Sequence, residues 1–405
     1  MLTRVLSQRN FAIYLTGSAF SLHGLWIQRV AIGWLAWELT ASEAWLGLLA
    51  LAELMPVVIF GPLFGVWADR LDRKTFAYVT NGINIVLCGL LGLLTALAVI
   101  DIYTLWIITA LLGCVSSAFQ PVRLSLIPSL VPRELLSEAV AAQSIVFNVS
   151  RFLGPAIAGI MIAAFGLWSA FAINAASYFA MIAALLIVEI RPRASRGGPS
   201  HFLADFKAGF AYTYTHAEIR WQILVVAISA LTGRATIQML PAFAGDVYAG
   251  GSSMLATLTS VAGAGAVIAG LVLARLDVGH GLRRATLLGT IVTGALMALL
   301  GATDNLVAGI VALAALGFCL TLVGIGSQTV IQTEVTEAMR GRVLSLWAAV
   351  AFAAPALGGV MIGLSAELWG LGATTVVAGG LCAVPATVMA WRTRGRRSRL
   401  VSPAD

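Results

Sequence analysis

The stretch GPLFGVWADRLDRK, residues 61–74, decides the fold of this chain. It closes an apolar run from Leu46 to Trp67 with five charges in six residues, and a second apolar run begins at Thr75. About 20 apolar residues are enough for a helix to cross the hydrocarbon core of a bilayer. The stretch therefore predicts the end of one membrane helix, a tight charged turn and the start of the next helix.

The composition is that of an all-α membrane protein. Of the 405 residues, 60% are hydrophobic and 11% are charged, whereas about 25% of the residues in a soluble domain are charged. The length leaves room for about twelve spans joined by short loops. We place these helices at residues 10–38, 44–68, 75–99, 102–120, 138–165, 168–189, 220–245, 253–274, 284–303, 305–330, 342–365 and 368–391.

The net charge of +7 follows membrane topology and does not indicate a nucleic-acid partner. With a cytoplasmic N-terminus, every basic residue outside the helices falls in an inner segment, and the outer loops carry only acids such as Glu43 and Asp101. Lys and Arg concentrate on the cytoplasmic side of membrane proteins. We therefore predict a multi-pass protein of the bacterial inner membrane with both termini in the cytoplasm.

The chain also contains two copies of one pattern. GVWADRLD at 65–72 resembles GLVLARLD at 270–277, and GPAIAG at 154–159 resembles APALGG at 354–359. The repeat predicts two pseudo-symmetric six-helix halves, residues 1–190 and 220–391, with a cytoplasmic linker at 191–219 and a basic cytoplasmic tail at 392–405. In the linker, aromatic residues recur at every fourth position from Phe202 to Tyr214, which predicts an amphipathic helix on the membrane surface.

The charged turn resembles the signature between the second and third helices of the major facilitator superfamily of secondary transporters. Its spacing runs from Gly65 through Asp69 to Arg73. That signature carries a glycine where this chain has Asp72, so either the turn needs no left-handed residue or Asp72 tolerates that conformation.

The resemblance implies a conformational switch around the carboxylate of Asp69. From the end of the second helix it can reach nearby arginines or the positive N-terminal end of the eleventh helix. In the family, such contacts lock the cytoplasmic side when the carrier faces outward. The residues assigned to this switch are Gly65, Asp69, Arg70, Arg73, Arg123, Gly154 and Pro155.

The fifth helix carries SRFLGPAIAG at 150–159, which resembles the antiporter signature of drug exporters. Ser150 and Ala158 replace glycines of that signature, but both are small enough for close helix packing. The resemblance favours export, although such a face also occurs for packing alone.

Residues 26–31 (WIQRVA), 128–132 (PSLVP) and 148–155 (NVSRFLGP) are similar to bacterial exporters of the enterobactin-exporter and macrolide-efflux type. This resemblance implies proton-coupled efflux, by alternating access, of a siderophore, antibiotic or related metabolite.

The sequence contains no motif for ATP hydrolysis or for a metal site. Neither lysine follows the Gly-x-x-x-x-Gly of a phosphate-binding loop, so the energy must come from an ion gradient or from the substrate's own gradient. There is no His-Glu-x-x-His pattern, and the four cysteines lie in apolar runs at unrelated spacings. We predict a monomeric transporter that is not an enzyme, has no cofactor or metal site, and has a small molecule, protons and membrane lipids as partners.

Four ionisable residues lie deep in the predicted helices: Arg29, Glu53, Arg151 and Arg234. A charge at the bilayer centre costs about 2.5 to 3.5 kcal/mol on insertion scales, so these residues are functional candidates. Counted from the helix ends, Arg29 and Glu53 lie at nearly the same depth, which predicts an ion pair. Arg151 and Arg234 lie near the midplane, one in each half.

Three cations against one carboxylate predict a cavity for a substrate with acidic or phenolic oxygens, which guanidinium groups bind in a bidentate way. Alternatively, Arg151 and Arg234 bind helix ends or loop carbonyls and only support packing. The residues assigned to substrate binding are His23, Trp26, Arg29, Arg151, Arg234 and Gln238.

Glu53 is the first candidate for proton coupling, because a substrate that competes for Arg29 would release it to take up a proton. A permanent structural ion pair is the alternative. Histidine is the side chain whose ordinary pKa lies nearest physiological pH, so His23 is the second candidate, although it could simply be a hydrogen-bonding residue of the cavity. Two further functions stay open: a lipid or lysolipid carrier of the same fold, and a non-transporting membrane sensor or scaffold.

Overall fold

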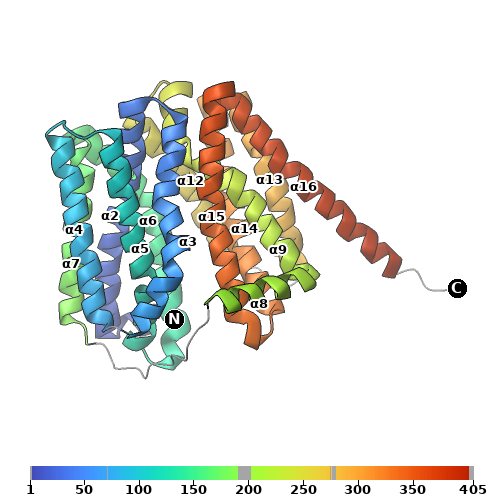
Figure 1. Ribbon diagram of the computed structural model, residues 1–405, viewed down its shortest axis with the longest axis horizontal. Coiled ribbons are helices and arrows are strands. Elements are labelled where there is room, and N and C mark those ends of the chain that lie inside the picture. Colours follow the sequence, from blue (N-terminus) through green and yellow to red (C-terminus); the bar gives the residue numbers. More distant parts are fainter. Residues whose placement is uncertain (1, 71, 190–201, 274, 276–279, 401–405) are drawn as a thin grey trace.

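The computed structural model describes residues 2–70, 72–189, 202–273, 275 and 280–400. Within these residues the chain is helical and contains no strand. The helices form two bundles that stand side by side, α2 to α7 in one and α9 to α16 in the other (Figure 1). Helix α8 lies across the lower end of the second bundle, on the side where the N-terminus is found.

Each predicted membrane helix has a counterpart. The first bundle contains α2 (Arg9–Thr40), α3 (Glu43–Arg70), α4 (Arg73–Ala96), α5 (Ile102–Leu130), α6 (Leu136–Phe165) and α7 (Trp168–Ile187). The second contains a broken helix followed by α12 (Ser252–Leu273), α13 (His280–Ala302), α14 (Leu306–Glu334), α15 (Glu337–Trp369) and α16 (Leu371–Leu400). The broken helix consists of α9 (Ala217–Ser229), η2 (Ala230–Arg234), α10 (Ala235–Gln238), α11 (Leu240–Ala242) and η3 (Phe243–Val247). The short elements are α1 (Leu2–Leu6), η1 (Arg133–Leu135) and α8 (Phe202–Thr215).

Among the described residues, ten helices are long and apolar enough to cross a membrane. The broken helix, which bends by 40°, makes an eleventh span when its parts are counted together. Helix α2 carries His23, Gln28 and Arg29 within its 32 residues and is not among these spans. The count of twelve therefore depends on α2 and stays a prediction.

Two predicted helices end later than expected on the side of α8. Helix α5 continues to Leu130, so Arg123 belongs to a helix and not to a loop. The prediction ended this helix just before Pro121, but a proline is tolerated in a membrane helix because neighbouring groups satisfy the freed backbone. Helix α16 runs to Leu400, so the predicted tail is helical over most of its length.

The turn between α3 and α4 resolves the question raised by Asp72. Its φ of −62° and ψ of 117° are extended, so the turn needs no left-handed residue here. Asp72 is the N-cap of α4, and its Oδ2 accepts a hydrogen bond of 2.8 Å from the backbone N–H of Thr75. This hydrogen bond lowers the pKa of the Asp72 carboxyl because it stabilises the charged form.

The predicted switch is only partly within view. Five of the residues assigned to the switch have side chains that the structure does not describe. These positions are Gly65, Asp69, Arg70, Arg73 and Arg123. Their contacts stay a prediction.

Small residues let the two bundles approach each other closely. Where α3 packs on α15, a Cβ at Gly47 would overlap the carbonyl group of Gly359. Where α6 packs on α12, a Cβ at Gly159 would lie 2.6 Å from the Cβ of Ala256. The repeated pattern lies in α6 with Pro155 and in α15 with Pro355. Each copy of the repeat therefore contributes one of these two close contacts between the bundles.

Helix α8 covers the stretch predicted to be amphipathic. Phe210 and Tyr214 are 59% and 66% exposed, whereas Gly209 faces the end of α15, where a Cβ would lie 2.8 Å from the carbonyl oxygen of Arg342. The helix is therefore held against α15 with aromatic side chains directed away from it. Its placement on the membrane surface stays a prediction.

Replacing Asp72 with Ala should destabilise the protein by about 1 kcal/mol, because the first turn of α4 loses its side-chain acceptor. Asp72→Asn keeps an acceptor oxygen and should retain most of the stability. The lowered pKa means that the stabilisation by the ionised cap is present above the ordinary carboxyl pKa and is lost as pH falls through the folded-state value. Thermal unfolding in detergent measures this effect, and an unchanged midpoint for Asp72→Ala would contradict it.

Candidate functional site

Arg29 of α2 and Glu53 of α3 form the predicted ion pair. Nη2 of Arg29 lies 2.6 Å from Oε1 of Glu53, and Nε donates a hydrogen bond of 2.7 Å to the same oxygen. The two side chains remain 35% and 29% exposed although they lie in the middle of long helices. The pair thus joins the first two membrane helices at a place that solvent can reach.

The ring of Trp26, almost one turn before Arg29, contacts Arg29 and a second arginine. The Cζ atoms of Arg29 and of Arg151 in α6 lie 4.7 Å and 5.7 Å from the centre of its ring. Phe147 packs edge-on at 5.9 Å. Cation–π attraction contributes about 0.5 to 2 kcal/mol, so the indole holds guanidinium groups from two helices at one place. Its buried Nε1 has no hydrogen-bond partner among the described residues.

Gly154 makes this arrangement possible. A Cβ at this position would lie 2.5 Å from the Cβ of Trp26, so α2 and α6 could not approach as closely with a larger residue. One turn earlier, Oγ of Ser150 lies 2.9 Å from Nδ1 of His23, and that nitrogen lies 2.8 Å from the carbonyl oxygen of Ala19. A protonated Nδ1 donates to the carbonyl oxygen or to the hydroxyl oxygen, whereas an unprotonated Nδ1 can only accept from the hydroxyl.

Arg234 approaches the interface from the second bundle. It ends the π-helical segment η2, and such segments inside α-helices frequently occur at functional sites. Its Nη2 lies close to α14, since a Cβ at Gly324 would be 3.1 Å away. Arg29 and Arg151 meet at the ring of Trp26, and Arg234 lies within electrostatic range of Arg151. We refer to these three cations as the arginine cluster.

Arg151 and Arg234 are half-buried, and neither has a carboxylate within salt-bridge distance in the part of the chain that the structure describes. Neither makes a hydrogen bond to a described helix end. Glu53 is therefore the one described carboxylate that is paired within this cluster, which keeps an excess of positive charge.

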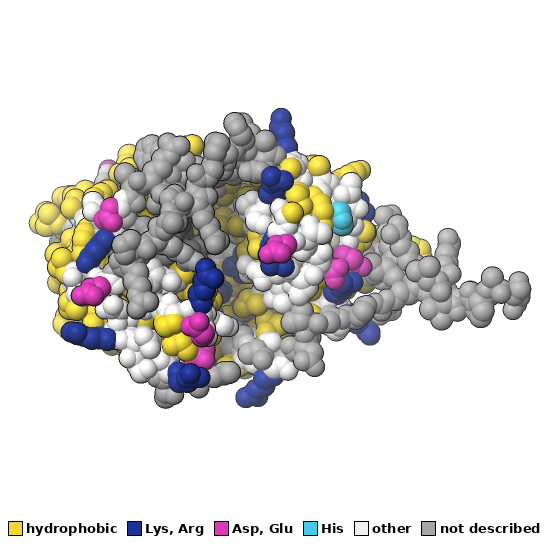
Figure 2. All heavy atoms as spheres, turned by 90° about the horizontal axis from the view of Figure 1, so that it is seen from below, with side chains coloured by type: hydrophobic (Ala, Val, Ile, Leu, Met, Phe, Trp, Pro, Cys, Tyr) yellow, Lys and Arg dark blue, Asp and Glu magenta, His cyan; other side chains and the backbone are white. Residues whose placement is uncertain are grey.

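The side opposite α8 is closed. Ser42, just before α3, donates a hydrogen bond to Glu367 of α15. Pro241 of the broken helix packs against Gly33 of α2, where a Cβ would lie 3.0 Å away. Seen from the side of α8, the molecule is recessed between the two bundles (Figure 2). With the predicted topology, the structure is closed outside and open toward the cytoplasm.

The sequence analysis missed a buried polar network behind the arginines. Nδ2 of Asn174 in α7 donates a hydrogen bond of 2.7 Å to Oε1 of Gln28 and lies 3.5 Å from Sγ of Cys88. Oγ of Ser177 donates one of 3.1 Å to Oδ1 of Asn174. Amide side chains form hydrogen bonds across helices in membranes. The presence of Gln28 and Asn174 within apolar runs was therefore the signal in the sequence that could have predicted this network.

The structure brings together five of the predicted site residues around Trp26: His23, Trp26, Arg29, Glu53 and Arg151. Gln238 is half-buried at the end of α10, immediately before the bend. It makes no hydrogen bond to the cluster within the described residues.

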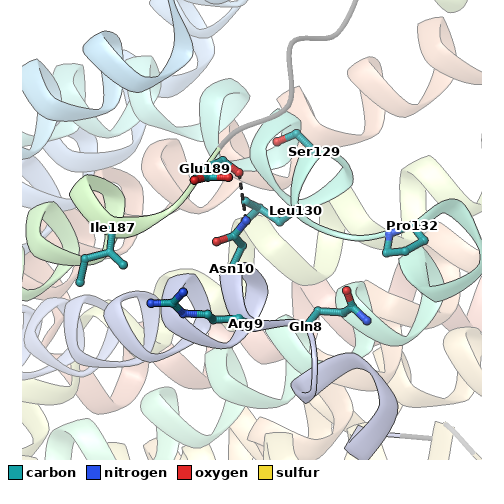
Figure 3. A pocket seen from close by; sticks show the side chains of 8 residues that line it. All are labelled: Gln8, Arg9, Asn10, Ser129, Leu130, Pro132, Ile187 and Glu189. Carbon is teal, nitrogen blue, oxygen red and sulfur yellow. Dashed lines mark hydrogen bonds between the residues drawn. The ribbon is translucent and has the colours of Figure 1, made fainter.

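A separate polar pocket of about 320 Å³ lies where α2 begins and α5 and α7 end (Figure 3). Nδ2 of Asn10 donates a hydrogen bond of 3.3 Å to the carbonyl oxygen of Glu189 across it. The pocket contains none of the predicted substrate residues. It is lined by Gln8, Arg9, Asn10, Ser129, Leu130, Pro132, Ile187 and Glu189.

Two repeated helical bundles with charged residues at their interface define a membrane transporter of the major facilitator fold. A bacterial homologue of the human lysosomal transporter Spinster, in an inward-facing unoccupied conformation, has this fold with a TM-score of 0.75, 16% identity and coverage of 98% of this chain and 99% of that one. The nucleoside transporter NupG gives a TM-score of 0.70 with 13% identity over 94% of this chain and 98% of that one.

The chain belongs to the transmembrane secretion effector family of this superfamily, whose profile matches residues 4–399. It is 26% identical over 381 residues to the staphyloferrin A transporter of Staphylococcus aureus, with coverage of 90% of this chain and 92% of the relative. It is 28% identical over 309 residues to the enterobactin exporter EntS of Escherichia coli, with coverage of 74% and 71%. The predicted superfamily and fold are thus confirmed.

Enlarging Gly47 should open the outer side, because a Cβ there overlaps α15 and overpacking costs about 1 to 3 kcal/mol. With a single reporter cysteine at position 238, Gly47→Ala should raise labelling by an impermeant thiol reagent in whole cells several-fold. Gly89→Ala is the matched control, since a Cβ at Gly89 meets nothing within 4 Å. Equal labelling of both variants would contradict the assignment of this contact to the outer gate.

Proposed function

We propose that this transporter exports a small organic anion across the bacterial inner membrane in exchange for protons. The observation that carries the proposal is the cluster of three guanidinium groups with one carboxylate at the interface of the bundles. A guanidinium stays charged at any physiological pH, and an unpaired buried charge is costly. An anionic substrate would supply the missing negative charge.

The relatives support a siderophore or a related metabolite as the substrate, since one is a staphyloferrin A transporter and another an enterobactin exporter. The antiporter-like pattern at 150–159 supports export. In the structure its Gly154 and Ser150 contact Trp26 and His23 of α2, so the pattern lies at the proposed substrate site itself.

The Arg29–Glu53 pair offers a route for proton coupling. For antiport, the substrate and the proton must occupy the site in turn. While the substrate is bound, the ionised Glu53 would accept a hydrogen bond from a donor group of the substrate and Arg29 would bind its anionic group. After the substrate has left on the outer side, Glu53 would take up a proton there and release it when the carrier faces the cytoplasm again. His23 is the second candidate, because protonation of Nδ1 changes its contact with Ser150.

The conformational step would use the predicted switch around Asp69 on the cytoplasmic side. Formation of those contacts would close the recess seen in Figure 2 while the outer contact between Ser42 and Glu367 opens. Both termini would stay in the cytoplasm, the protein would act as a monomer, and α8 would rest on the lipid surface.

Transport of matched fluorescent compounds by everted membrane vesicles tests this function. Dansyl-glutamate is anionic and dansyl-cadaverine is cationic, and both carry the same fluorophore. Vesicles with the protein should accumulate dansyl-glutamate when acidified inside, and a protonophore should abolish the accumulation. Uptake of the cation alone would refute anion export, and uptake of neither would favour the lipid or lysolipid carrier.

Glu53→Gln should abolish proton-driven uptake of dansyl-glutamate while exchange of internal for external dansyl-glutamate continues, because the neutral side chain cannot carry the coupled proton. Glu218→Gln is the matched control, since Glu218 pairs with Arg283 at 3.3 Å outside the cluster. Normal proton-driven uptake by Glu53→Gln would eliminate this residue from coupling and leave His23 as the candidate.

A further inference from the structure

We infer that the substrate carries two carboxylate groups and that Arg151 binds one from the first bundle while Arg234 binds the other from the second. This inference rests on the proposed export of an anion. It adds the number of negative groups that the site accepts and the residue that receives each of them.

Arg151 is held with its donors available. Its Cζ lies 5.7 Å from the ring of Trp26, and a guanidinium that packs on an aromatic ring keeps its N–H fork for planar acceptors. Arg29 differs, because its Nε and Nη2 already contact Glu53. Of the two arginines at Trp26, Arg151 is therefore the one with an open fork.

Arg234 is fixed by the backbone around it. The carbonyl group of Leu231, in the same π-helical segment, lies so close to Gly358 of α15 that a Cβ there would overlap it. On the other side, the absence of a side chain at Gly324 leaves room for Nη2 of Arg234. The guanidinium thus lies in a space bounded by α14, without a described carboxylate next to it.

The two cations belong to opposite bundles and lie near the helices through which the bundles meet. The carbonyl oxygen of Arg151 would lie 3.0 Å from a Cβ at Gly263 of α12, which places Arg151 where the bundles meet. The carbonyl group of Ala262, next to Gly263, lies against Gly317 of α14, about two turns from the Gly324 that adjoins Nη2 of Arg234. Helix α12 therefore links the surroundings of the two arginines. One carboxylate would compensate one of the two guanidinium groups, whereas two carboxylates compensate both and offer each fork a bidentate partner.

Dansyl-glutamate and dansyl-glutamine test this directly, because they differ by one carboxylate replaced by an isosteric amide. Wild-type vesicles should take up the diacid about tenfold more efficiently than the amide, as expected for one charge-assisted hydrogen-bonded pair. Arg151→Gln and Arg234→Gln should each lower uptake of the diacid to the level of the amide. The ratio of diacid uptake to amide uptake should therefore fall to about one in each variant.

Arg220→Gln is the matched control, because Arg220 packs on Tyr214 at 5.6 Å outside the cluster and its loss removes the same charge. This variant should keep the tenfold preference. Arg151→Lys and Arg234→Lys control for misfolding of the glutamine variants. Both keep the positive charge and should retain part of the preference for the diacid, since an ammonium group binds as a point charge without the planar fork of a guanidinium.

Equal uptake of dansyl-glutamate and dansyl-glutamine by the wild type would overturn the inference, as would an unchanged preference in both glutamine variants. In either case, proton-driven uptake of both anions would leave the proposed function standing. Uptake of dansyl-cadaverine without either anion would refute the proposed function itself.

Discussion

The rest of the structure depends on how charges are accommodated between apolar helices. Arg29 is stabilised by Glu53 of α3 on one side and by the ring of Trp26 on the other, and the same ring receives Arg151 of α6. These contacts require three helices to meet at one depth, and Gly154 provides the necessary approach. Since lone ions in a membrane interior are costly, these contacts favour the packing of α2, α3 and α6 around the charged side chains.

The broken helix connects the surroundings of the charged residues with the contacts between the bundles on the side opposite α8. Arg234 ends one π-helical segment, the helix bends around Met239, and Pro241 then packs on Gly33 of α2. Farther out, Gly245 lies in a second π-helical segment, where a Cβ would overlap the indole of Trp37. A cation and a gate contact thus share one element whose backbone hydrogen-bonding pattern changes twice. That element offers a physical connection between the proposed substrate site and the side opposite α8.

Several features could be predicted because they depend only on position along a helix. The order of the membrane helices followed from hydropathy, and the Arg29–Glu53 pair followed from equal depth at 1.5 Å per residue. The later end of α5 was missed because Pro121 stops helices in water but not in a membrane. The pairing of Gln28 with Asn174 was missed because hydropathy does not report which face of one helix meets which face of another.

The sequence by itself therefore determined that this is a multi-pass helical membrane protein of the major facilitator fold and that Arg29 and Glu53 lie opposite each other in adjacent helices. It did so because the bilayer imposes a fixed thickness and a strong penalty on charge. Only the tertiary structure decided that Trp26 contacts two arginines, that Asp72 caps α4 and that Arg234 lies in a π-helical segment. These features depend on the rotation of each helix about its axis and on the close approaches that glycine allows, and both are settled by packing between distant segments.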